Sequence, residues 1–131
     1  MRDCEGTMHP RARAGIVLFN QGHYFEAHEQ LEIAWRAESG RIRQLYQGIL
    51  EAGVTYLHIR RHNFAGALKV YGRSMRWLRG WPDICRGACI GQLRRDMDAI
   101  IAETRRLGPT RMAEIDPKFF KPIVWKEGSG G

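Results

Sequence analysis

Proline is absent from residues 11–81 of this chain. Because proline is the strongest breaker of α-helices, this long interval is free to form helices. It also lacks the sustained alternation of apolar and polar residues that half-buried strands show. Helix stop signals interrupt it at Gly22, Ser39-Gly40 and His62-Asn63. The sequence therefore predicts an all-α protein.

The spacing of the stop signals predicts helices over residues 10–20, 24–38, 41–61 and 64–78, and a fifth from Gly87 or Ala88 to Leu107. Prolines at positions 117 and 122 favour an extended tail after them. The tail's apolar residues predict that it packs back onto the helices: Phe119, Phe120, Ile123, Val124 and Trp125. We expect a five-helix bundle of two helical hairpins, a fifth helix and this tail. Residues 1–127 form one predicted domain, and residues 128–131 are interpreted as a flexible tail or a cloning remnant.

A weak repeat links the two predicted hairpins. Tyr24 and Ala27 recur as Phe64 and Ala67, a shift of 40 residues. The pattern resembles a tetratricopeptide unit, whose usual period is about 34 residues. Two units are fewer than a free-standing array needs, so we expect the fifth helix and the tail to close the core.

The charge is positive and unevenly distributed. The net charge is +7, and residues 60–131 carry 15 Lys and Arg against 7 Asp and Glu. Such a basic half is typical of proteins that bind nucleic acid, but arginines at helical spacing also describe a solvated helix face, so both readings stay open. No apolar run approaches the roughly 20 residues needed to cross a bilayer, and no membrane association is expected.

The three cysteines form an odd set. An odd number does not suit a disulfide framework, so we expect small buried side chains and a cytoplasmic location. Cys85 and Cys89 are spaced for one helical face, but no further Cys or His lies near enough to complete a zinc site.

The candidate functional residues lie on the second and third predicted helices. His28 falls within the apolar stripe of residues 24–38, with Glu32 at its edge, so His28 is expected to be largely buried. The third helix is apolar around most of its circumference except for one polar stripe: Gln44, Gln47, Glu51, Thr55 and His58. A short loop makes the two helices antiparallel neighbours. This arrangement predicts one polar cluster between them: His28, Glu29, Glu32, Gln47, Glu51 and His58.

Three interpretations of this cluster remain open. It is a hydrogen-bonded seam that fixes helix register, a pocket for a small molecule or peptide, or a metal or acid/base site. In the last case His28, Glu32, Glu51 and His58 would hold a divalent zinc, iron or manganese ion. The His-Glu-x-x-Glu run lacks the second histidine of the zinc-protease motif, so that reaction class is not supported.

Several segments resemble the domain of unknown function 309 family. They are Phe19-Asn20-x-Gly22-x-Tyr24-Phe25-Glu26-Ala27-His28-Glu29-x-Leu31-Glu32-x-x-Trp35, Tyr46-Gln47-Gly48-Ile49 with its apolar continuation to His58, and Asn63-Phe64-x-Gly66-Ala67-Leu68. The resemblance implies a compact, tetratricopeptide-like helical bundle and no particular activity. It places signature positions at Glu29, Glu32, Trp35, Gln47 and His58, which adds Trp35 to the candidate polar pocket.

The primary hypothesis is a cytoplasmic binding module with a protein or small-molecule partner. The alternatives are a metal-dependent or acid/base enzyme and a basic nucleic-acid-associated protein.

Overall fold

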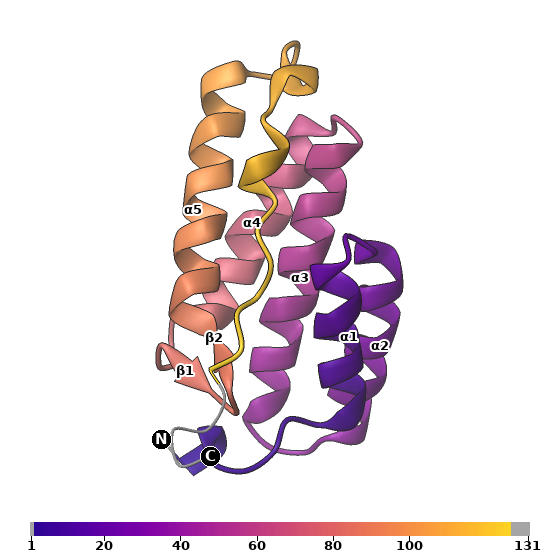
Figure 1. The fold of residues 1–131 in the computed structure, drawn as a ribbon, viewed down its shortest axis with the longest axis vertical. Coiled ribbons are helices and arrows are strands. Elements are labelled where there is room, and N and C mark those ends of the chain that lie inside the picture. Colours follow the sequence, from indigo (N-terminus) through magenta and orange to yellow (C-terminus); the bar gives the residue numbers. More distant parts are fainter. Residues whose placement is uncertain (1, 127–131) are drawn as a thin grey trace.

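The computed structural model describes residues 2–126, and five α-helices account for most of them (Figure 1). They are α1 (Pro10–Asn20), α2 (Tyr24–Ala37), α3 (Ile42–Arg60), α4 (Phe64–Leu78) and α5 (Ile90–Leu107). Short 3-10 turns cover η1 (Arg2–Cys4), η2 (Met112–Glu114) and η3 (Pro117–Phe119). The predicted all-α bundle is confirmed, because the first four helices begin and end within one residue of the expected positions.

The fifth helix differs from its prediction at the start. Residues predicted as helical form instead part of a small antiparallel hairpin of β1 (Ile84–Cys85) and β2 (Ala88–Cys89). The turn holds Arg86 at φ 48° and Gly87 at φ 88°. Positive φ at both central residues is the geometry of a tight type I′ hairpin turn, and it ends any helix. The fifth helix therefore begins at Ile90, two or three residues later than predicted.

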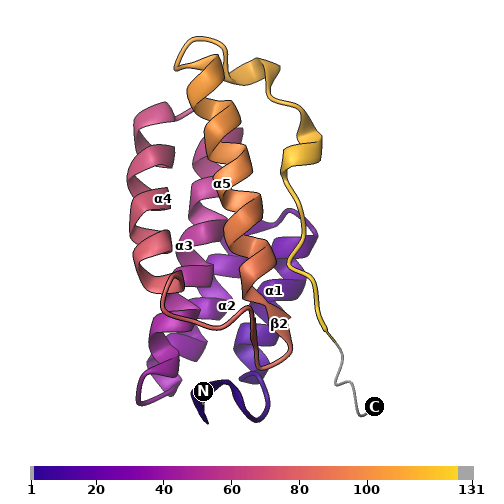
Figure 2. The ribbon, with the colours of Figure 1, turned by 90° about the vertical axis from the view of Figure 1, so that its left-hand side faces the viewer.

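Helix α3 lies at the centre of the bundle, with α2 on one side and α4 on the other (Figures 1 and 2). Its inner residues are almost all buried. Gly48 lets α4 approach closely, since a Cβ at this position would lie 2.6 Å from Leu78 Cδ2. Helix α5 packs against α4, and Ser74 of α4 contacts both α3, at Gly48 O, and α5, at Met97 Sδ. The two predicted hairpins, α1–α2 and α3–α4, share one core with α5.

The turns between the paired helices are built alike. After α1, Gly22 has φ 81° and the His23 amide donates to Leu18 O at 2.9 Å. After α3, His62 has φ 59° and the Asn63 amide donates to His58 O at 2.8 Å. Both are Schellman-type caps, with the left-handed residue at the same place. The two left-handed residues, Gly22 and His62, are 40 positions apart, which is the shift of the predicted repeat. The likeness to a tetratricopeptide unit stays a prediction.

The chain after α5 returns along the bundle toward the hairpin, and we call residues 111–126 the C-terminal strap (Figure 1, yellow). Asn20 clamps it through both amide atoms: Oδ1 accepts from Ile123 N at 2.7 Å and Nδ2 donates to Ile123 O at 3.0 Å. Further on, Cys89 N donates to Val124 O and Lys126 N donates to Gly87 O, each at 2.8 Å. The expected packing of the tail is thus confirmed, although Val124 itself is exposed.

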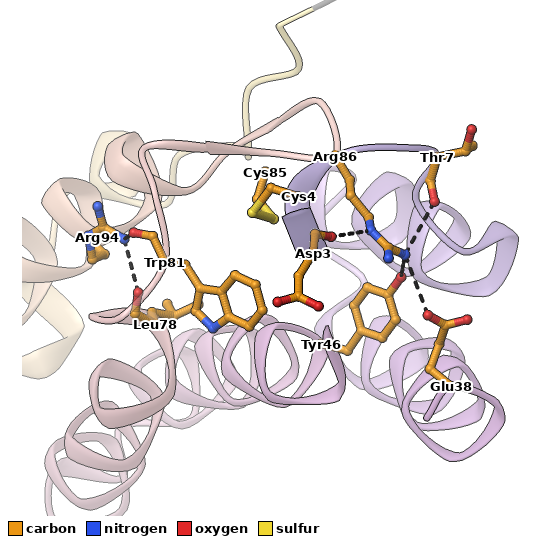
Figure 3. Close-up of a disulfide and its surroundings, with 10 residues drawn as sticks. All are labelled: Asp3, Cys4, Thr7, Glu38, Tyr46, Leu78, Trp81, Cys85, Arg86 and Arg94. Atoms are coloured by element: carbon orange, nitrogen blue, oxygen red, sulfur yellow. Dashed lines mark hydrogen bonds and ion pairs between the residues drawn. A yellow bond between two sulfur atoms is a disulfide. The ribbon is translucent and has the colours of Figure 1, made fainter. Parts of the chain in front are cut away.

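A disulfide joins Cys4 to Cys85, 81 residues apart (Figure 3). The bond contradicts the expectation that all three cysteines are reduced. It can form because residues 2–8 fold beneath the bundle and bring η1 against β1. Arg86 reinforces this contact: its Nε donates to Asp3 O at 2.8 Å and its Nη1 to the Tyr46 hydroxyl at 3.2 Å. Cys89 remains a free thiol. The cysteine count therefore no longer supports a cytoplasmic location, which stays a prediction.

Within residues 2–126, no helix is long and apolar enough to cross a membrane. The segment interpreted from the sequence as a tail, residues 128–131, lies outside the described residues.

Candidate functional site

The predicted site residues are spread along α3 and its neighbour α2 instead of meeting at one point. Glu51 is buried and Glu29 is exposed, while the other members are half-buried: His28, Glu32, Trp35, Gln47 and His58. His28 is therefore less buried than expected. Gln47 and His58 are eleven residues apart on α3, which corresponds to about 16 Å along a helix. The structure divides the predicted cluster into two pockets with Glu51 between them.

One pocket lies toward the end of α3 and has a volume of about 240 Å³. It brings His28 and His58 together, among apolar side chains and one arginine; its lining is Phe25, His28, Val54, Leu57, His58 and Arg61. The Phe25 and His28 rings lie 6.2 Å apart, and Phe25 is 52% exposed. We call this site the histidine pocket.

The two histidines of this pocket are held differently. His58 Nδ1 lies 3.1 Å from Asn63 Nδ2, and Asn63 Oδ1 accepts from Gly66 N at 3.0 Å as the cap of α4. His58 is therefore positioned by the turn that follows its own helix. His28 Nδ1 is buried and has no hydrogen-bond partner within residues 2–126. A buried nitrogen without a partner costs about 1–3 kcal/mol, so a donor or acceptor brought by a ligand would be favoured there.

The second pocket lies at the start of α3 and has a volume of about 430 Å³. Two indole rings, from α2 and α4, face two glutamine side chains of α3; the lining is Trp35, Gly40, Arg43, Gln44, Gln47 and Trp77. The Arg43 guanidinium lies 4.8 Å from the Trp35 ring centre, and its Nε donates to Trp35 O at 3.0 Å. This contact fixes the orientation of Trp35. We call this site the tryptophan pocket.

Glu51 separates the two pockets and faces α4. Glu51 is 8% exposed, and Arg73 Nε lies 3.5 Å from its Oε1. Burial raises the pKa of Glu51, although Arg73, hydrogen bonding from Gln47, and the nearby Arg76 and Trp77 all act to lower it. Its second oxygen, Oε2, is buried without a partner within the described residues. Glu51 is therefore biased toward its neutral form compared with an exposed glutamate.

The predicted pairing across the seam between α2 and α3 is not what the structure shows. Glu32 pairs with Arg36 of its own helix at 2.8 Å, and the Thr55 hydroxyl donates to Glu51 O of its own helix at 2.8 Å. Each helix thus satisfies these polar groups locally or toward α4.

The predicted metal ligands do not converge either. No group of three His, Cys, Asp or Glu side chains among residues 2–126 is arranged to hold a metal ion. This corrects the predicted joint ligand set of His28, Glu32, Glu51 and His58, because only His28 and His58 line the same pocket.

Sequence reasoning missed the contributions of Trp77, Phe25 and Arg43. Trp77 is 37% exposed and forms a wall of the tryptophan pocket. The sequence could have identified Phe25 as a surface residue of the site, because this aromatic residue lies on the polar side of α2 next to His28.

Together these features define a helical bundle with two side-chain pockets along its central helix. The family model Domain of unknown function (DUF309) matches residues 12–70, so this part of the chain belongs to that family. The match covers the turn between α1 and α2 and the turn between α3 and α4, and it ends within α4. Trp77, the β-hairpin, α5 and the C-terminal strap lie beyond it. No curated protein matches the chain significantly.

Proposed function

We propose that this protein is a docking module that holds a short acidic segment of a protein partner along α3. The observation that carries the proposal is the placement of two pockets, of about 240 and 430 Å³, toward the two ends of one stripe on α3. Two anchor pockets on one helix fit two side chains of a single bound segment. One compact ligand would instead need the polar groups to converge.

The spacing of the pockets sets the length of the segment. The α3 residues of the tryptophan pocket centre near Gln44, and those of the histidine pocket centre near Leu57. Thirteen residues of helix correspond to about 20 Å. A partner covers this span with about six extended residues or with roughly three and a half turns of helix, so two apolar or aromatic anchors at that spacing are expected.

Charge favours an acidic partner. Arg43 lines the tryptophan pocket and Arg61 lines the histidine pocket. Glu32 is paired with Arg36, and burial raises the pKa of Glu51, so the opposing negative charge is partly offset. Complementary charge of this kind raises the association rate and excludes basic competitors.

The basic second half offers less support for nucleic acid as the partner. Within residues 2–126, five of its arginines are engaged in ion pairs: Arg73 with Glu51, Arg86 with Glu38, Arg94 with Asp83, Arg106 with Glu103, and Arg111 with Glu114. Arginines committed to carboxylates are less available for phosphates. An enzymatic role has no convergent acid and base to rest on, because Glu32 and Glu51 have separate partners.

A display selection of random 16-residue peptides tests the proposal directly. We expect the selected peptides to be acidic, to carry two apolar or aromatic anchors, and to bind less tightly as salt is raised. Phe25→Ala and Trp77→Ala should each weaken binding at least about tenfold. Val17→Ala is the matched control, because Val17 is an exposed apolar residue on α1 outside both pockets.

Two outcomes would contradict the docking module. The first is that no peptides are enriched over an unrelated helical protein. The second is that enriched peptides bind the Phe25 and Trp77 variants as tightly as the unsubstituted protein.

A further inference from the structure

A third cavity, of about 360 Å³, lies on another face of the molecule and is independent of α3. It is open to solvent and is bordered by the start of α5, the β-hairpin and the C-terminal strap. The lining residues are Asp83, Ile84, Cys89, Gln92, Arg95, Asp96, Lys121, Pro122, Val124 and Lys126. We call it the strap cavity.

Asp96 supplies a buried negative charge to this cavity. It is 6% exposed, and its Oδ1 accepts a hydrogen bond from Gln92 Nε2 at 2.7 Å. No Lys, Arg or His within residues 2–126 forms an ion pair with it. Burial raises the pKa of the nearby Tyr56, and the charge of the Asp96 carboxylate adds to that rise. A buried carboxylate without a cation is costly, so a positively charged group entering from the cavity would be stabilised.

The rim of the strap cavity carries the opposite charge. Arg95, Lys121 and Lys126 line it, and the two lysines are exposed. Asp83 also lies on the rim, but Arg94 Nη2 neutralises it at 2.8 Å. Between the buried acid and the basic rim the walls are apolar, formed by Ile84, Pro122 and Val124.

The walls are held in place before any ligand arrives. Cys89 N donates to Val124 O at 2.8 Å, which joins the strap to the hairpin. Gly91 N donates to Asp83 O at 3.0 Å, which joins α5 to the segment before the hairpin. The disulfide of Cys85 fixes the opposite face of the same hairpin. A cavity with fixed walls binds a small ligand with a smaller entropic cost.

We propose that the strap cavity binds a small organic zwitterion. Its protonated amine contacts Asp96, its apolar body lies against Ile84 and Val124, and its carboxylate contacts the basic rim of Lys121 and Lys126. Each end of such a ligand meets a charge that forms no ion pair within residues 2–126, and the volume suits a molecule of about ten non-hydrogen atoms.

The test compares three six-carbon ligands: 6-aminohexanoate, hexanoate and hexylamine. Binding to the full chain is followed by chemical-shift titration of backbone amides, with Cys89, Gln92, Asp96 and Val124 as reporters. We expect 6-aminohexanoate to bind at least about tenfold more tightly than either single-charge ligand. If hexanoate or hexylamine binds as tightly, or if the shifts lie away from these reporters, the proposal is overturned.

Variants separate the two charged ends. Asp96→Asn should weaken 6-aminohexanoate to the level of hexanoate, and Lys121→Gln should weaken it toward the level of hexylamine. Lys118→Gln is the matched control, because Lys118 is an exposed strap lysine that does not line the cavity. Should Asp96→Asn fail to fold, the lysine pair and the ligand comparison on the unsubstituted protein still decide. Equal affinity of the Lys121 and Lys118 variants would refute the basic rim.

Discussion

Opening the Cys4–Cys85 disulfide should destabilise the protein substantially. The bond closes a loop of 81 residues, which includes four of the five helices within residues 2–126. In the chain-entropy description, a loop of this length restricts the unfolded chain by about 4.5 kcal/mol at 25 °C, whereas disulfides typically contribute about 2–4 kcal/mol. We therefore expect the free energy of unfolding to fall by about 2–4 kcal/mol on reduction.

Part of the contact beneath the bundle survives without the bond. Arg86 N donates to Cys4 O at 3.0 Å, and Arg86 Nε donates to Asp3 O at 2.8 Å. Hydrogen bonds of this kind contribute only about 0.5–1.5 kcal/mol each. They hold η1 near the hairpin in the reduced protein but do not replace the covalent closure, so the lower stability should appear with the native fold retained.

Urea unfolding followed by tryptophan fluorescence, with and without reductant, measures the effect. Cys4→Ser measured with reductant should reproduce the reduced protein, because Cys4 is only half-buried and the serine hydroxyl can reach water. Cys89→Ser is the matched control and should behave like the unsubstituted protein under oxidising conditions, since Cys89 is on the other face of the hairpin. Thiol titration of the denatured, unreduced chain should detect one thiol. Three thiols, or an unfolding midpoint that does not respond to reductant, would refute the reasoning.

Three further predictions concern α3 and the turns. Glu51→Gln should stabilise the protein by roughly 1 kcal/mol at pH 7, because it removes a buried negative charge whose Oε2 atom has no partner within residues 2–126. Burial raises the pKa of Glu51 above its usual 4.5, so the folded state binds its proton more tightly and stability falls as the pH rises through that window. The stabilisation by Glu51→Gln, measured by urea unfolding, should disappear near pH 4. If the variant is instead less stable at pH 7, the ion pair with Arg73 contributes more than the burial of the charge costs. Gly48→Ala should cost about 1–3 kcal/mol through the clash with Leu78, whereas Gly72→Ala, with nothing within 4 Å of the added Cβ, should be neutral or slightly stabilising. Thermal unfolding of the pair checks this, and equal shifts would contradict it. Gly22→Ala should cost about 1 kcal/mol because its φ is 81°, while His62→Gly at the equivalent turn should stabilise by less than about 1 kcal/mol. Chemical unfolding that destabilises both variants equally would show that the turns are not equivalent.

The helices could be predicted from the sequence because their ends are set by local chemistry. Asn63 caps α4 through its side chain, and Gly22 takes the left-handed conformation that ends α1. The hairpin could not be predicted in the same way. Arg86 adopts a positive φ that a non-glycine residue rarely takes, and its hydrogen bonds to Asp3 and Tyr46, far along the chain, help to hold it there. The disulfide depends on the same long-range contact, so it could not be predicted from the spacing of the cysteines in the sequence.

The candidate site could be predicted in composition but not in layout. Helical periodicity identified which side of α2 and α3 carries His28, Gln47 and His58, and the structure places these residues along the two pockets. Periodicity gives the angle around a helix and leaves the level along it open. The prediction treated residues on facing sides as if they were at one level, and it therefore merged two pockets into a single cluster.

Counting residues from the loops supplies the missing level. In an antiparallel pair, residues equally far from the loop lie side by side. Trp35 is two residues before the end of α2 and Gln44 two after the start of α3, and they share the tryptophan pocket. Phe25 and Val54 are each twelve residues from those ends and share the histidine pocket.

The same counting explains the position of Glu51. It is nine residues after the start of α3 and nine before its end, so two residues compete for it at one level. His28 is nine before the end of α2, and Arg73 is nine after the start of α4. The carboxylate lies beside Arg73 at 3.5 Å, and the permanent charge of the guanidinium stabilises it. His28 Nδ1, at the same level on the other side of α3, has no partner within residues 2–126 and lies in the histidine pocket.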